Sequence, residues 1–129
     1  MIEELLEMRI FSMIFLLFYV SSSVAADKKG NYAIWGAGNA SCHKYIMARA
    51  ANDDEKYKNY IMGYFTAYNH EAADTYSITN EMNLNEILAW IDEQCELKQM
   101  ISFEEILTTF ILDNYEGRMK TPPGRNIGR

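Results

Sequence analysis

Few residues of this chain have types and spacings that could support metal chemistry. His70, Glu71 and Asp74 come within one residue of the H-E-x-x-H motif, in which two histidines one helical turn apart bind zinc and the glutamate activates water. Asp74 stands where the second histidine would be, and His43 is the only other histidine. Since the sequence offers no evident third ligand, we expect a polar loop here and no metal site.

Two further patterns touch on catalysis or cofactor binding. Cys42 precedes His43, but neighbouring residues of a helix do not face each other, and an oxidised cysteine is not a nucleophile. Residues 35–38 (WGAG) resemble the start of a phosphate-binding loop, yet Ser41 occupies the place of the third glycine in G-x-G-x-x-G. We expect a turn before a helix, no catalytic residue and no cofactor.

Carboxylates gather around Cys95. Asp92 and Glu96 share a helix face at i, i+4, with Glu93 beside them. Paired acids can perform general acid–base catalysis, but on an exposed helix they are usually solvated, and we expect surface here. Because no group combines a nucleophile or metal with a partnered base, the sequence predicts a protein that is not an enzyme.

The N-terminal segment is typical of a signal peptide. Residues 10–20 (IFSMIFLLFYV) carry no charge and are too few to span a bilayer as a helix, and the small residues 21–26 (SSSVAA) follow them. We expect cleavage after Ala25 or Ala26, so that residues 1–25 are a signal peptide and the mature protein keeps no stable membrane anchor. The predicted location is the periplasm or the medium.

The first residues do not fit this pattern as they stand. Three acids, Glu3, Glu4 and Glu7, precede the apolar run, where a positive segment is expected. A start at Met8 would give Met-Arg followed at once by the apolar run. The alternatives are a start at Met1 or at Met8, or an acidic amphipathic helix packed on the domain.

Cys42 and Cys95 are the only cysteines, and both follow the predicted cleavage site. Export normally leads to an oxidising compartment, in which an even pair becomes a disulfide. We therefore predict a Cys42–Cys95 bridge. In the chain-entropy model, a bridge that closes a loop of this length stabilises the folded state by roughly 4 kcal/mol.

Charge narrows the range of partners. After cleavage 15 acidic and 11 basic residues remain, a net charge of −4, with +4 on residues 118–129 and −8 on residues 26–117. Because an acidic body repels phosphate backbones, we expect no nucleic-acid partner. We expect residues 118–129 to be a basic, disordered tail.

Apolar periodicity predicts four amphipathic helices, over residues 41–51, 52–68, 83–98 and 102–115, after an irregular arm pinned by Tyr32, Ile34 and Trp35. The last three are preceded by N-cap residues with a glutamate three positions later; these N-caps are Asn52, Asn83 and Ser102. No segment alternates as a strand does. The fold class is therefore all-α, a small four-helix bundle-like domain over residues 26–117 in which the disulfide ties the first helix to the third.

Three segments, 35–49 (WGAGNASCHKYIMAR), 60–69 (YIMGYFTAYN) and 87–95 (ILAWIDEQC), resemble a group of small exported helical proteins. These are bacterial proteins related to the HdeA/HdeB acid-stress chaperones and, more distantly, the Rap1a/Tai-type immunity proteins. The shared pattern is a cysteine opening the first helix, a segment that starts with Gly-aromatic and ends in Asn closing the second, and Trp-hydrophobic-Asp-x-x-Cys in the third. Its residues here are Cys42, Gly63, Tyr64, Asn69, Trp90, Ile91, Asp92 and Cys95. The chain departs from many relatives at residues 96–99 (ELKQ), where they carry Asn-Pro.

The resemblance implies an exported stress or binding protein that exposes apolar surface to protein clients in acid. At pH 2 the carboxylates would be largely protonated, which takes the mature net charge from −4 to about +13 with both histidines. The alternative is an envelope immunity protein or inhibitor whose acidic surface covers a basic active-site rim. The expected partner is a protein, and a homodimer is compatible with either function.

Overall fold

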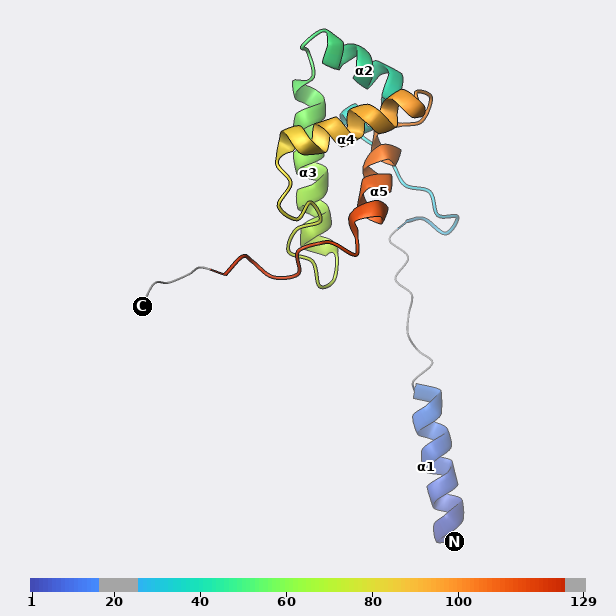
Figure 1. Ribbon diagram of the computed structural model, residues 1–129. Helices are drawn as coiled ribbons and strands as arrows, with labels where there is room; N and C mark the ends of the chain where they lie inside the picture. The colour runs from blue at the N-terminus through green and yellow to red at the C-terminus, as the bar shows by residue number, and fades with distance from the viewer. Residues whose placement is uncertain (17–25, 125–129) are drawn as a thin grey trace, which may run out of the picture. The chain divides into compact units, whose positions relative to one another are not determined.

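The computed structural model describes residues 1–16 and 26–124, with the side chains of residues 10–16 left aside (Figure 1). The chain divides into two units, Met1–Ala33 and Ile34–Arg129, and each is described by itself. Over the described residues the structure is all-α, which confirms the predicted class; its helices are α1 (Ile2–Leu16), η1 (Gly36–Asn39, a 3₁₀ turn), α2 (Cys42–Ala50), α3 (Glu55–Glu71), α4 (Leu84–Leu97) and α5 (Phe103–Asn114).

The first unit contains α1, a helix in addition to the four that were predicted. It covers the start of the predicted signal peptide, and apolar side chains such as Leu5 and Leu6 are exposed on it. In the part of the chain that the structure describes, no helix has the length and apolar character needed to cross a membrane. Residues 17–25, which hold the end of the apolar run and the predicted cleavage site at Ala25, lie outside the described residues.

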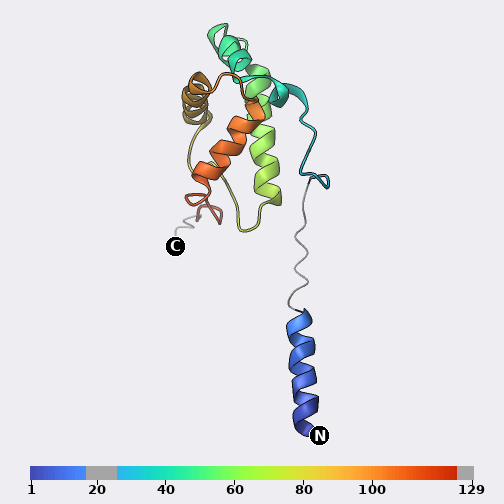
Figure 2. The same cartoon turned by 90° about the vertical axis from the view of Figure 1, so that its right-hand side faces the viewer.

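The second unit is built around α3 and α5, which lie side by side and run in the same direction, while α4 crosses them (Figures 1 and 2). Aromatic rings join the elements at two levels. Phe103 lies 4.8 Å from Tyr45 and 4.9 Å from Tyr57, and Phe110 lies 4.9 Å from Phe65 and 5.1 Å from Trp90, measured between ring centroids. Together with the buried aliphatic side chains these rings form one core; α4 crosses α3 and α5 and does not run alongside them as in a regular bundle.

Two of the three predicted N-caps are confirmed. Asn83 and Glu86 form a reciprocal capping box with hydrogen bonds of 3.0 and 2.8 Å, and the Ser102 hydroxyl accepts from the backbone N–H of Glu105 at 3.2 Å. Each cap satisfies N–H groups that the first turn of a helix leaves free. A further cap, Ser41, accepts from the N–H of Lys44 and starts α2.

The predicted N-cap at Asn52 is wrong, although Asn52 does end α2. Its φ is +52°, and its N–H donates to the Arg49 carbonyl at 3.2 Å, so it closes α2 in the left-handed conformation that asparagine tolerates. Asp54 instead precedes α3, and its side chain makes no cap hydrogen bond. Its carboxylate is bound by Arg49 and Lys58, as described below.

The arm before α2 is attached differently from the prediction. Trp35, which was expected to pin the arm, is 83% exposed, whereas Ile34 is partly buried. The contact is made by Gly38, which is buried directly against the ring of Tyr60: a Cβ at this position would overlap that ring. A larger residue at this position would therefore force the Tyr60 ring to move where η1 meets α3.

The start of the predicted disordered tail is ordered. The backbone of Met119 pairs with Ser77 in an isolated antiparallel bridge, with N···O distances of 2.9 and 3.0 Å. The Arg118 guanidinium lies over the Tyr115 ring at 3.9 Å and donates to the Thr75 hydroxyl at 3.0 Å. The helical domain thus extends beyond residue 117, and residues 125–129 lie outside the described ones.

Candidate functional site

The predicted disulfide is present. Cys42 is the first residue of α2 and Cys95 lies in the last turn of α4, with Cα atoms 5.0 Å apart and both side chains fully buried. The backbone N–H of Cys42 also donates to the carbonyl of Ile101 at 2.8 Å. The bridge therefore links α2 to α4 covalently, close to the start of α5, and leaves α3 outside the covalent link.

A single guanidinium joins α2, α3 and α4. Arg49, at the end of α2, donates through Nε and Nη2 to the two carboxylate oxygens of Asp92 on α4, at 3.0 and 2.8 Å. Its Nη1 donates to Asp54, directly before α3, at 2.9 Å. The Tyr45 hydroxyl completes the group by donating to Asp92 at 2.6 Å. We call Tyr45, Arg49, Asp54 and Asp92 the junction cluster.

The protonation states of the junction cluster follow from these contacts. The hydrogen bond from Arg49 holds the pKa of Asp54 below its ordinary value, with Lys58 adding to the effect and burial opposing it. Hydrogen bonds to Asp92 and Asp54 raise the pKa of Arg49. Burial, followed by the bond to Asp92, raises the pKa of the Tyr45 hydroxyl, so it remains a neutral donor. At neutral pH the cluster is therefore a charged link between helices.

A second carboxylate joins α3 to α5. Glu104 is only 5% exposed, and its Oε1 accepts from the Tyr64 hydroxyl at 2.6 Å and from the Thr108 hydroxyl at 3.2 Å. A buried carboxyl must be hydrogen-bonded to be tolerated, and a short bond between a hydroxyl and a carboxylate is of the stronger kind. Glu104 thus ties the middle of α3 to the first turn of α5.

The residues of the near-zinc motif do not form a site. His70 Nδ1 lies 2.7 Å from Glu71 on the exposed end of α3, whereas Asp74 pairs with Lys120 at 3.5 Å and lies 3.9 Å from Arg118. Among the described residues no group of three or more His, Cys, Asp or Glu side chains could hold a metal ion.

The other candidate residues are separated in a similar way. Cys42 is in the disulfide, and His43 Nδ1 lies 3.2 Å from the side chain of Gln99. Of the three acids around Cys95, Glu93 and Glu96 are exposed, as expected, whereas Asp92 is bound in the junction cluster.

Sequence reasoning did not single out Arg49, Asp54 or Glu104. Glu104 carried a detectable signal, because it precedes Leu107 and Ile111 by three and seven residues and so lies within the apolar stripe of its helix. The pairing of Arg49 with Asp92 carried none, since the two residues are 43 positions apart and only the folded chain brings them together.

No protein-family model, no curated protein and no solved structure matches the chain. The resemblance to HdeA/HdeB therefore rests on the three sequence segments alone, and the geometry above is the basis for assigning a function.

Proposed function

We propose that this chain is an exported, non-enzymatic protein that binds other proteins when acid loosens its helix packing, in the manner of an acid-stress chaperone. The observation that carries the proposal is the way α3 is attached. Carboxylates link it to α2 and α5, whereas the disulfide that links α2 to α4 does not titrate.

The links of α3 lie along its length. Asp54 binds Arg49 before its first turn, Glu104 accepts from Tyr64 in its middle, and Asp74 pairs with Lys120 just beyond its end. The Asp74 pair is exposed and adds little by itself. The first two are shielded from water, so their loss would weaken the attachment of the helix.

Acid acts on the Asp54 link in a defined direction. The pKa of Asp54 is lowered in the folded state. Its contribution to stability is therefore fully present above the pKa of an aspartate in the unfolded chain, about 3.9, and is lost as the pH falls through the lower pKa that Asp54 has in the folded protein. Over the same range the mature chain gains positive charge while the basic groups keep theirs, and self-repulsion opposes the compact state.

The surface that would be released is apolar and aromatic. The inner face of α3 carries Tyr57, Ile61 and Phe65, each at most 4% exposed, against Phe103 and Phe110 of α5. The disulfide would limit the expansion of the loosened chain, so this surface would become available without complete unfolding.

Export is part of the proposal. A buried disulfide is consistent with a location outside the cytoplasm, and the predicted signal peptide would direct the chain there. Cell fractionation with intact-mass analysis tests this part: the mature protein should begin at Ala26 or Asp27, and a mature species that keeps residues 10–20 would contradict it. The chaperone activity is tested by an acid aggregation assay, which is described at the end of the Discussion.

A further inference from the structure

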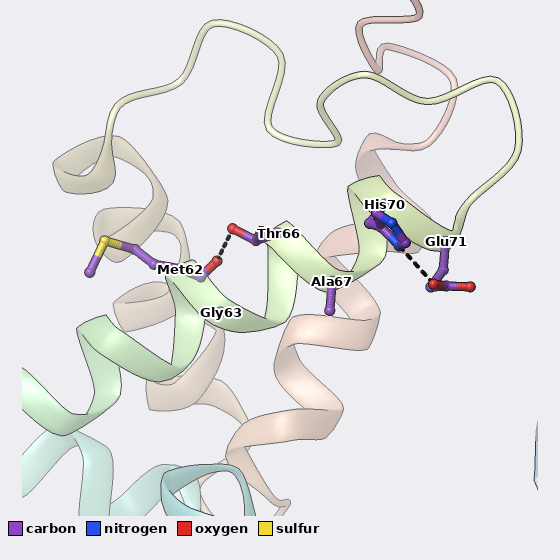
Figure 3. Close-up of a pocket in the computed structure, with 6 residues that line it drawn as sticks. All are labelled: Met62, Gly63, Thr66, Ala67, His70 and Glu71. Atoms are coloured by element: carbon purple, nitrogen blue, oxygen red, sulfur yellow. Dashed lines mark hydrogen bonds and ion pairs between the residues drawn. The ribbon is translucent and has the colours of Figure 1, made fainter.

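The outer face of α3 borders an open hollow of about 510 Å³. Its lining is largely apolar, and Figure 3 shows the labelled residues along one side of the helix; they are Met62, Gly63, Thr66, Ala67, His70 and Glu71. The Thr66 hydroxyl donates to the Met62 carbonyl of its own helix at 2.6 Å, so it is already satisfied. Met62, Gly63, Thr66 and Ala67 are exposed, and no heavy atom would lie within 4 Å of a Cβ on Gly63, so this part of α3 has room for an incoming group.

A second hollow, of about 360 Å³, shares Met62 and Thr66 with the first and lies between α3, α4 and the loop that joins them. Buried core side chains reach its floor: Ile61 and Phe65 from α3 and Ile87 from α4. None of the residues that line it is charged. It therefore has the character of a pocket for a large apolar side chain.

The wall of this second hollow is fixed by a residue of the sequence pattern. Asn69 Oδ1 accepts from the backbone N–H of Ile78 at 2.8 Å, and the Ile78 side chain is fully buried. Thr79, next along the loop, lines the hollow. The loop is thus held beside α3 in the folded protein.

Charge distinguishes the ends of this surface from its middle. A third hollow, of about 430 Å³, shares Thr79 with the second and is bordered by Glu81 and Glu86. Glu71 borders the first, where His70 is the one basic side chain in the lining of the three hollows. The surface therefore has an apolar centre between acidic ends.

We propose that these three hollows, which we call the α3 groove, bind an extended segment of a partner protein that carries large apolar side chains interspersed with lysine or arginine. An apolar side chain would enter the central hollow over Phe65, and the basic side chains would face Glu71 at one end and Glu81 at the other. This site goes beyond the proposed function, because it operates in the folded protein at neutral pH, whereas the acid-released surface is the inner face of α3.

The test is fluorescence anisotropy at pH 7 with the full mature chain and two labelled peptides. The first is a short peptide of alternating leucine and lysine, and the second replaces each lysine with glutamate. We expect saturable binding of the basic peptide and at least about tenfold weaker binding of the acidic one. Equal binding of the two peptides, or no saturable binding of the basic one, would overturn the proposal.

Two variants locate the site. Thr66→Arg places a long cation at the boundary of two hollows and should weaken binding of the basic peptide about tenfold, whereas Asn59→Arg, which adds the same charge on an exposed position of α3 outside the three hollows, should change it less than about twofold. Glu71→Lys should weaken binding of the basic peptide and strengthen binding of the acidic one. It is compatible with folding, since a cation suits the end of a helix.

Two further results would count against the groove. Equal losses in Thr66→Arg and Asn59→Arg would show that charge alone governs binding. A concentration-dependent dimer in sedimentation equilibrium that Thr66→Arg dissolves would make a second copy of the chain the occupant. Circular dichroism of each variant confirms that the helices are retained.

Discussion

Arg49 holds Asp92 with two nitrogens, Nε on one carboxylate oxygen at 3.0 Å and Nη2 on the other at 2.8 Å, and so joins the end of α2 to the middle of α4. The same guanidinium reaches Asp54 at 2.9 Å. This geometry depends on the planar fork of arginine, which a lysine cannot reproduce.

Replacing Arg49 should therefore destabilise the fold. We expect Arg49→Met to lower the free energy of unfolding by about 1–3 kcal/mol, because Asp54 and Asp92 lose their shared partner, and Arg49→Lys to recover only part of the loss. Urea unfolding at pH 7 measures this. The control is Lys44→Met, an exposed change on the same helix, which should lower the free energy of unfolding by less than about 0.5 kcal/mol. Equal losses in the two variants would mean that Arg49 does not hold the helices together.

Stability should fall as the pH drops below about 4. Asp54 has a lowered pKa in the folded state, so protonating it at low pH removes stability that is present at pH 7. Asp54→Asn should therefore be less stable than the wild type at pH 7 but lose less on acidification. Urea midpoints at several pH values between 7 and 3 measure this difference. The control is Glu55→Gln, an exposed change, whose urea midpoint should vary with pH as the wild-type midpoint does. A wild-type slope in Asp54→Asn would refute the role given to this carboxylate.

Breaking the disulfide should be costly. Cys42→Ser or Cys95→Ser should lower stability by roughly 2–5 kcal/mol, because the bridge closes a long loop and both sulfur atoms are fully buried. Denaturant unfolding measures the loss, and thiol titration of unfolded protein isolated from its native compartment checks the bond. Two reactive thiols in that titration would show that the bridge does not form in the cell.

Two glycines should respond in opposite ways to alanine. Gly38→Ala should destabilise by about 1–3 kcal/mol, because its new Cβ would overlap the Tyr60 ring. Gly63→Ala should stabilise by about 0.5–1 kcal/mol, since that helical position has no heavy atom within 4 Å of the new Cβ. Thermal unfolding of both variants tests the packing of η1 on α3, and similar shifts in the two would contradict it.

The helices could be predicted from sequence because their signals are local. The capping residues Asn83 and Ser102 lie within a turn of the groups that they satisfy, and apolar side chains recur along each helix. The same local reasoning misplaced a cap at Asn52, since the i, i+3 spacing to Glu55 fits a capping box whether or not the backbone turns there.

The junction cluster could not be predicted, because its contacts join distant segments. Nothing near Asp92 indicates that Arg49 will reach it, and nothing near Gly38 indicates that Tyr60 will pack on it. The disulfide could be predicted although it joins distant residues, because the chain has only two cysteines and they can pair in only one way. The order of Arg118 and Met119 escaped notice because their basic surroundings resemble a solvated tail.

The central claim, that acid turns this protein into a binder of other proteins, is tested most directly by light scattering. An acid-labile enzyme that aggregates by itself at pH 2–3 is incubated with and without the mature protein, and the same mixture is followed at pH 7 under mild heating. The account predicts that the protein suppresses scattering at pH 2–3 and leaves it unchanged at pH 7. Unchanged scattering at pH 2–3 with a several-fold molar excess of the protein would contradict it.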